Sequence, residues 1–111
     1  MIMSNGGSLK SILASARVRE KRCDWVGAIK LYSKASDYAV IQADSWKLGE
    51  LEERVGFCFY RASMQAESRD KFRESLQRAI ISYGKALEYY EKMRNDRAIG
   101  CRFRCRALSK Y

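Results

Sequence analysis

Residues 24–35, DWVGAIKLYSKA, contain a pattern that returns in outline at residues 78–86, RAIISYGKA. In both segments an alanine is followed four residues later by a tyrosine and three residues after that by a second alanine. Residues three and four positions apart lie on the same face of a helix, so each set of three shares one face. Small residues on that face let a second helix approach closely, and the tyrosine fills the space beside it. An internal repeat of this kind predicts stacked helical hairpins.

The composition favours one all-α domain. The chain has 111 residues, of which 47% are hydrophobic and 32% charged, and it has no proline. This length suits a single modest core, and the residue types are weighted toward helix formers. No apolar run approaches the ~18 residues of a membrane-spanning helix, and residues 1–16 lack the layout of a secretory signal. We therefore expect a cytoplasmic protein with no membrane partner.

Capping residues divide the chain into about five helices. Ser8 is a candidate N-cap for the first helix and Asp24 for the second, and Ser68 or Asp70 is a candidate for the fourth. The pair Asn95-Asp96 is the clearest turn. The expected organisation is a flexible N-terminus at 1–7, a hairpin at 8–43, a hairpin at 46–94 and an additional helix at 97–111. The unbalanced charge also suggests that the chain is part of a longer protein.

Apolar residues at helical spacing give the expected core. The first hairpin would bury Leu9, Ile12, Leu13, Ala16, Ala28, Ile29, Tyr32, Ala35 and Ala39, with Cys23 as a further candidate. The rest of the chain would bury Leu48, Leu51, Val55, Cys58, Ala62, Gln65, Phe72, Leu76, Ala79, Ile80, Tyr83, Ala86 or Leu87, Tyr90, Ala98, Cys101, Cys105 and Leu108. In adjacent aromatic pairs one ring must point partly outward. Tyr60, Tyr89 and Phe103 are therefore candidates for a binding surface, or simply exposed apolar side chains.

The repeat resembles the tetratricopeptide repeat family. In that family a small residue lies midway along the first helix of each pair, and the second helix carries alanine, an aromatic residue and alanine. Here Ala16 fits the first helix, and the second-helix positions are fitted by Ala28, Tyr32 and Ala35 in one copy and by Ala79, Tyr83 and Ala86 in the other. The resemblance implies antiparallel hairpins stacked as a short right-handed solenoid.

The two copies depart from the family's spacing. Ala28 and Ala79 are 51 residues apart, whereas the family repeats every ~34 residues. The second hairpin must therefore have lengthened helices or an inserted segment around residues 62–75. Val40 also stands where the family has a closing proline.

Function is expected to be partner binding rather than catalysis. Histidine is absent, so schemes that pair a serine or cysteine nucleophile with histidine are unavailable. We interpret the three carboxylates of Glu50, Glu52 and Glu53 as part of a solvated helix face rather than an acid–base pair. The four cysteines have no metal-ligand spacing and are expected to be buried, reduced thiols. Isolated glycines at 27, 49, 56, 84 and 100 fit no phosphate loop and indicate close helix approach. We expect no enzyme activity, cofactor or metal.

The net charge of +9 is concentrated near both ends of the chain. In tetratricopeptide arrays the first helices of successive pairs line a concave groove that holds a peptide. The resemblance implies that this groove carries partner-binding residues, namely Leu13 with the basic set Lys10, Arg17, Lys21, Arg97, Arg102, Arg104 and Arg106. Such a groove would favour an acidic peptide or partner protein. The alternative is that these basic residues form a solvated face.

Three other interpretations remain open. Arg102, Phe103 and Arg104, with Arg94, Arg97 and Arg106, form a cationic cluster with an interleaved aromatic ring that could bind nucleic acid. Residues 8–66 also resemble the microtubule-interacting-and-transport domain, a three-helix bundle that binds helical peptides. Finally, an unpaired fifth helix could support a homodimer through the C-terminal helix.

Overall fold

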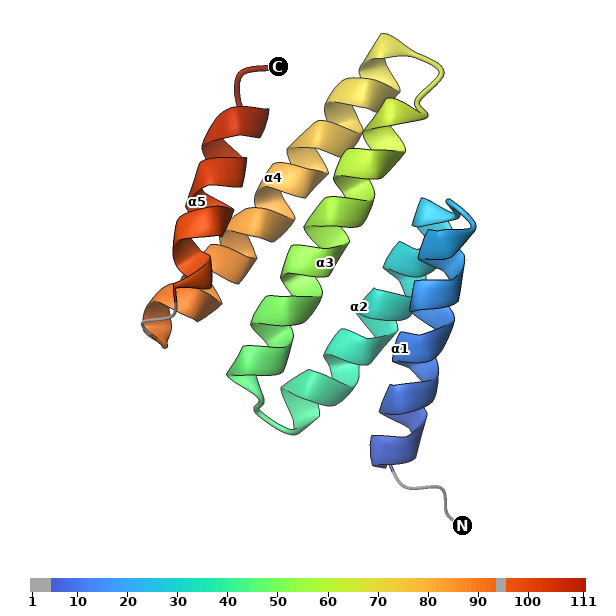
Figure 1. Ribbon diagram of the computed structural model, residues 1–111, viewed down its shortest axis with the longest axis vertical. Coiled ribbons are helices and arrows are strands. Elements are labelled where there is room, and N and C mark those ends of the chain that lie inside the picture. The colour runs from blue at the N-terminus through green and yellow to red at the C-terminus, as the bar shows by residue number, and fades with distance from the viewer. Residues whose placement is uncertain (1–4, 94–95) are drawn as a thin grey trace.

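The computed structural model describes residues 5–93 and 96–111, and these residues form an all-helical domain (Figure 1). Met1–Ser4, within the expected flexible N-terminus, lie outside the described residues, as do Arg94 and Asn95. The helices, in chain order, are α1 (Asn5–Lys21), α2 (Trp25–Ile41), α3 (Ser45–Met64), α4 (Arg69–Lys92) and α5 (Arg97–Leu108).

The helices form two layers. Consecutive helices run antiparallel, so α1, α3 and α5 point the same way along one face, with α2 and α4 behind them (Figure 1). The extensive helix–helix contacts join neighbours in the sequence, α1 with α2, α2 with α3, α3 with α4 and α4 with α5. The shortest extent of the molecule is 18 Å, which matches two helices of about 10 Å each.

Two of the turns have the same construction. At the ends of α1 and α2, Cys23 and Ala43 have positive φ angles of 60° and 53°. In each turn the next residue, Asp24 or Asp44, donates its backbone N–H to a carbonyl five residues earlier, as in a Schellman motif. The carboxylate of that aspartate then caps the following helix, at 3.0 Å from the N–H of Gly27 and of Lys47 respectively.

The N-terminal cap expectations are partly correct. Asp24 caps α2 as expected, and Ser68 rather than Asp70 caps α4, with its hydroxyl 3.2 Å from the Lys71 N–H. The expectation for Ser8 is wrong, because α1 begins at Asn5 and Ser8 therefore lies inside the helix.

The repeated pattern lies at the helix seams. Ala16, Ala28, Ala35, Ala79 and Ala86 are fully buried, and Tyr32 and Tyr83 are nearly so. The apolar stripes of α1, α2 and α3 meet in one cluster, and those of α4 and α5 continue the core. Of the two alternatives in α4, Ala86 is fully buried and Leu87 only partly. Two core assignments are wrong: Cys23 is exposed because it occupies the left-handed turn, and Gln65 is exposed because α3 ends at Met64.

Two glycines set the close approach of α3 and α4. A Cβ atom placed on Gly49 would lie 2.8 Å from Cε1 of Tyr90, and one on Gly56 would lie 3.1 Å from the ring of Tyr83. Gly49 and Gly56 are seven residues apart on α3, and Tyr83 and Tyr90 are seven residues apart on α4. The two tyrosines therefore lie against the two glycines in antiparallel register. The expectation is wrong for the other glycines. Gly27 leaves room for the capping carboxylate of Asp24, a Cβ on Gly84 meets nothing within 4 Å, and one on Gly100 meets only the Arg104 side chain at 3.5 Å.

The second hairpin is longer than the first. The helices α3 and α4 have 20 and 24 residues, against 17 each for α1 and α2. In Figure 1 the α3–α4 turn accordingly extends beyond the α1–α2 turn. Longer helices, rather than an inserted segment, therefore account for the 51-residue spacing of the two alanines.

Candidate functional site

A groove crosses the face on which α1, α3 and α5 lie. Its volume is about 570 Å³. Its apolar floor includes Leu13, Leu51 and Phe57, and its walls carry charged side chains from α1, α3 and α5. Tyr32 and Tyr83 reach it from the second layer, so both repeated tyrosines contribute to the lining.

Three groove arginines are each held between a carboxylate and an aromatic ring. Arg54 binds Glu20 and lies 4.4 Å from the centre of the Phe57 ring. Arg97 binds Glu50 at 3.4 Å and lies over Trp46, and Arg104 binds Glu53 at 3.0 Å and lies over Tyr83. A guanidinium held by an anion and a ring keeps a fixed orientation, so these three arginines give the groove wall a defined shape.

The Glu20–Arg54 pair joins the two hairpins at one end of the groove. Glu20 is only 9% exposed, and it accepts hydrogen bonds from Nε of Arg54 at 2.7 Å and from the Tyr32 hydroxyl. Burial alone would raise the pKa of Glu20, but the hydrogen bonds from Arg54 and Tyr32 outweigh it, and the pKa lies below its usual range. Burial, followed by the bond to this carboxylate, raises the pKa of Tyr32. Glu20 is therefore an anion that fixes Arg54, not a proton donor.

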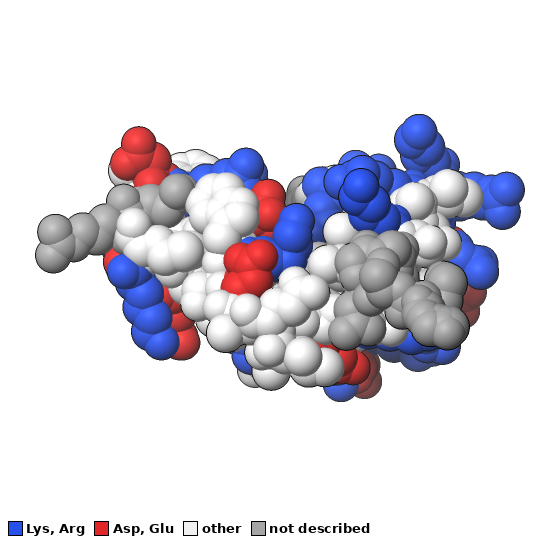
Figure 2. All heavy atoms as spheres, turned by 90° about the horizontal axis from the view of Figure 1, so that it is seen from below, with Lys and Arg blue, Asp and Glu red and all other residues white. Residues whose placement is uncertain are grey.

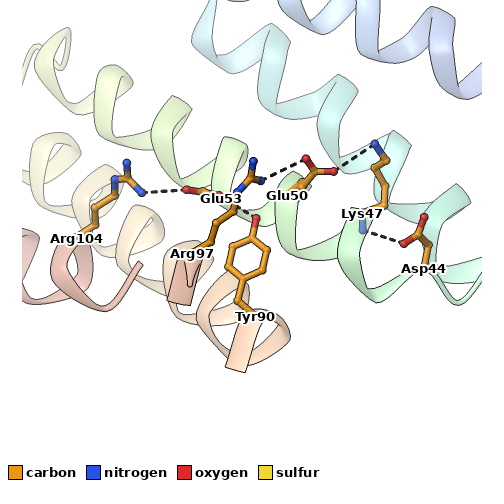
Figure 3. A network of polar contacts seen from close by, with 7 residues as sticks. All are labelled: Asp44, Lys47, Glu50, Glu53, Tyr90, Arg97 and Arg104. Carbon is orange, nitrogen blue, oxygen red and sulfur yellow. Dashed lines mark hydrogen bonds and ion pairs between the residues drawn. The ribbon is translucent and has the colours of Figure 1, made fainter. Parts of the chain in front are cut away.

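A second network joins α3 to the C-terminal part of the fold (Figure 3). Glu53 accepts a hydrogen bond from the buried Tyr90 hydroxyl at 2.9 Å and pairs with Arg104. Glu50 lies between Lys47 and Arg97, at 3.4 Å from each. The interpretation of these glutamates as a solvated face is wrong, because each is partly buried and bonded to another helix.

Glu52 lies on the other side of α3. It lines a second hollow of about 690 Å³ between α2 and α4, together with Phe59, Ile81 and Lys85. Burial raises the pKa of Glu52, and the charge of Lys85 opposes that shift. This hollow holds no close ion pair among the described residues, and its Arg78 lies 5.8 Å from the centre of the Phe59 ring without the carboxylate partner that each stacked groove arginine has.

Positive charge exceeds negative charge in the groove. Among the described residues, its lining has five cationic side chains and two carboxylates, Glu50 and Glu53. Arg17 makes no hydrogen bond or close ion pair with any residue of 9–93 or 96–111, and its charge acts on the more distant Glu20, whose pKa it helps to lower. Figure 2 shows lysines and arginines gathered on the side where α1 lies, whereas acidic and basic side chains alternate nearer α5. The α1 edge is therefore the more electropositive side of the groove.

The structure places the expected partner-binding residues in two groups. Leu13, Arg17, Arg97 and Arg104 line the groove together. Lys10, Lys21 and Arg106 are exposed but do not line it, and Arg102 pairs with Glu91 on α4. Of the three aromatic candidates, Tyr60 and Tyr89 are partly buried, and Phe103 is 72% exposed.

Sequence reasoning missed three groove residues, Arg54, Glu50 and Glu53, and it missed Glu20, which binds Arg54 from outside the lining. Arg54 is 34 residues from its partner Glu20, and Arg104 is 51 residues from Glu53, so no local spacing reveals either pair. One signal was available: Glu20 and Tyr32 flank the α1–α2 turn, at positions where two antiparallel helices can meet.

The cysteines show no redox or metal arrangement. All four are free; Cys58 and Cys101 are buried, Cys105 is half-buried and Cys23 is exposed. The expectation of buried thiols is thus wrong for Cys23. No group of metal-ligating residues occurs within the described part of the chain, and no helix described there is long and apolar enough to cross a membrane.

Comparison of the chain with protein-family models, with curated proteins and with solved structures gives no match. The candidate site therefore rests on the geometry of the groove and on its charges.

Proposed function

We propose that the protein is a non-enzymatic interaction module that binds an acidic segment of a partner protein in the groove across α1, α3 and α5. The observation that carries the proposal is the unbalanced charge of the groove over an apolar floor, with Arg17, which has no close ion-pair partner among the described residues, at one edge. An acidic segment would place its carboxylates toward α1 and an apolar side chain over Leu13, Leu51 and Phe57. The excess of guanidinium groups suits carboxylates, because arginine binds them with paired, charge-assisted hydrogen bonds.

We further propose that the chain is a tetratricopeptide-like solenoid. Support comes from the burial of all seven repeated positions, from the common orientation of α1, α3 and α5, and from the identical turns at Cys23-Asp24 and Ala43-Asp44. The alternative three-helix bundle over residues 8–66 has less support. Extensive contacts join only helices that are neighbours in the sequence, and α4 packs along α3 rather than standing as an appendage.

Nucleic-acid binding through the basic α5 is also less well supported. Arg97, Arg102 and Arg104 each pair with a carboxylate of the chain itself. A phosphate backbone would have to displace those carboxylates or bind beside them, and either reduces the electrostatic gain that dominates such complexes.

A peptide selection tests the proposed function. A displayed library of random 12-residue peptides would be panned against the full chain, and enriched peptides would be measured by fluorescence anisotropy. We expect acidic peptides with an apolar residue, and we expect Arg17→Gln to weaken their binding about tenfold, the equivalent of one charge-assisted contact worth ~1.4 kcal/mol.

The matched control is Lys30→Gln, which removes one exposed positive charge from α2, outside the groove lining. Equal weakening by both variants would mean that net charge, not the groove, attracts the peptide, and the proposal would fail. Enrichment of basic or neutral peptides would also refute it.

A further inference from the structure

The outward face of α5 carries a short apolar ridge. Ile99 is 67% exposed and Phe103 is 72% exposed. They are four residues apart, so they stand one above the other on the helix surface. This face differs from the buried face, which carries Ala98, Cys101 and Leu108, and from the groove face, where Arg97 and Arg104 lie.

Charged side chains of opposite sign lie at the two ends of the ridge. Asp96 precedes Ile99 by three residues, and Arg106 follows Phe103 by three. The four positions 96, 99, 103 and 106 follow the three- and four-residue spacing of a helix–helix seam. Both charged residues are exposed, and neither has an ion-pair partner among the described residues.

This arrangement is complementary to itself. When two copies of α5 pack antiparallel about a two-fold axis between positions 99 and 103, Ile99 of each copy meets Phe103 of the other. The same register brings Asp96 of each copy beside Arg106 of the other. A two-fold contact requires every residue to find its partner on an identical surface, and these four residues satisfy that requirement.

We propose that the outward face of α5 is a homodimer interface with this antiparallel register. Parallel packing would instead place Arg106 against Arg106 and Asp96 against Asp96. A partner of another kind would need its own acidic and basic ends in the same spacing, whereas a second copy supplies them already. One short helix per copy buries much less than a standard interface, so the dissociation constant is expected to be on the order of 100 µM.

A charge exchange tests both the dimer and its register. Sedimentation velocity would be measured on the full chain between 10 µM and 1 mM, concentrations chosen to span the expected constant. The wild type should rise from its monomer mass of 12.9 kDa toward about twice that value. Asp96→Arg alone and Arg106→Asp alone should each remain monomeric, because each brings like charges together in its own homodimer.

The two single variants should associate when they are mixed, since every cross-copy pair then joins an arginine to an aspartate. The double variant Asp96→Arg/Arg106→Asp should likewise recover the wild-type dimer. Asp96 makes no side-chain cap hydrogen bond, so these changes remove no cap, and circular dichroism would verify that each variant is folded. A mixture that stays monomeric while the wild type dimerises would overturn the register.

Two isoleucine variants, one in the proposed contact and one outside it, test the apolar part of the interface. Ile99→Glu should abolish dimerisation, and Ile41→Glu should leave it unchanged because Ile41, which is 75% exposed, lies at the end of α2. A wild type that is monomeric at 1 mM would refute the proposal, as would a dimer that survives Ile99→Glu. None of these residues lines the groove, so peptide binding and dimerisation can fail independently.

Discussion

Replacing Gly49 with alanine tests whether the α3–α4 seam is as close as the structure shows. In the interior of an exposed helix, alanine stabilises by about 1 kcal/mol relative to glycine. At Gly49 the added Cβ would lie 2.8 Å from Cε1 of Tyr90 and 3.2 Å from Cβ of Tyr89. The ring of Tyr90 is fully buried, with its hydroxyl bonded to Glu53 and its ring beside Trp46, so it has little room to move.

The expected effect of Gly49→Ala is the difference of two terms. Overpacking a close helix contact costs about 1–3 kcal/mol, and the gain in helix propensity returns about 1 kcal/mol. We expect a net loss of about 1 kcal/mol, which corresponds to a fall in melting temperature of roughly 4 °C for a domain of this size. The measurement is thermal unfolding followed by circular dichroism at 222 nm, supported by urea titration.

Gly84→Ala is the matched control. Gly84 lies in the interior of α4, and a Cβ there meets nothing within 4 Å. The same substitution should therefore stabilise the protein by about 1 kcal/mol, and the two variants should move the melting temperature in opposite directions. An equal increase from both variants would show that α3 and α4 do not approach at Gly49, and the reasoning on the seam would be refuted.

Two further predictions concern buried titratable groups. Glu20→Gln should destabilise the protein by about 1–3 kcal/mol at pH 7, at the lower end because Arg54 is half-exposed. The pKa of Glu20 is lowered in the folded state from its ordinary value of 4.5, so its contribution is complete above that pH and disappears as the pH falls through the folded value. Urea titrations at pH 7 and pH 3 should thus show a smaller difference in the free energy of unfolding between wild type and variant at pH 3. A difference that stays the same would contradict the conclusion that Glu20 stabilises the fold as an anion. Iodoacetamide should modify Cys23 rapidly in the native protein and Cys58 and Cys101 only on unfolding, because the latter two are buried and burial raises their pKa to about 12 and about 11. Mass spectrometry of peptides over a time course measures this, and fast native labelling of Cys58 would show that the α2–α3 core is open.

The helices and their buried faces follow from local information, and the sequence predicts them well. Three- and four-residue spacing identifies the core positions of each helix, from Ala16 in α1 to Leu108 in α5. Asp24 marks a helix start because its carboxylate can reach a free N–H three residues ahead. The errors occur where local rules compete. Glycine is the usual residue at a left-handed helix end, but here Cys23 and Ala43 occupy that conformation, so the turn at Cys23 displaced a side chain that was expected in the core.

The role of each glycine could not be predicted from the sequence, because it depends on which residues of another helix lie opposite. Gly49, Gly56 and Gly84 are all single glycines in helical segments, and their neighbours in the chain do not distinguish them. Only the register of α3 against α4 places Tyr90 and Tyr83 over the first two and leaves the third uncovered. That register is set by the lengths of both helices and of the turn between them.

The groove shows why its electrostatics were predicted only in part. The sequence indicates correctly that arginines gather near both ends of the chain, but it treats each as a free charge. Packing brings carboxylates of α1 and α3 beside arginines of α3 and α5, so that Glu20, Glu50 and Glu53 neutralise Arg54, Arg97 and Arg104. Among the described residues, the groove cation without a close ion-pair partner is Arg17 of α1, because the nearby acidic residues are already bound: Glu20 to Arg54, and Asp24 to Arg19 and the start of α2. Selectivity for an acidic partner would therefore come from the N-terminal edge of the groove rather than from the arginine-rich C-terminal helix, because a charge already paired within the fold gains little from a second anion.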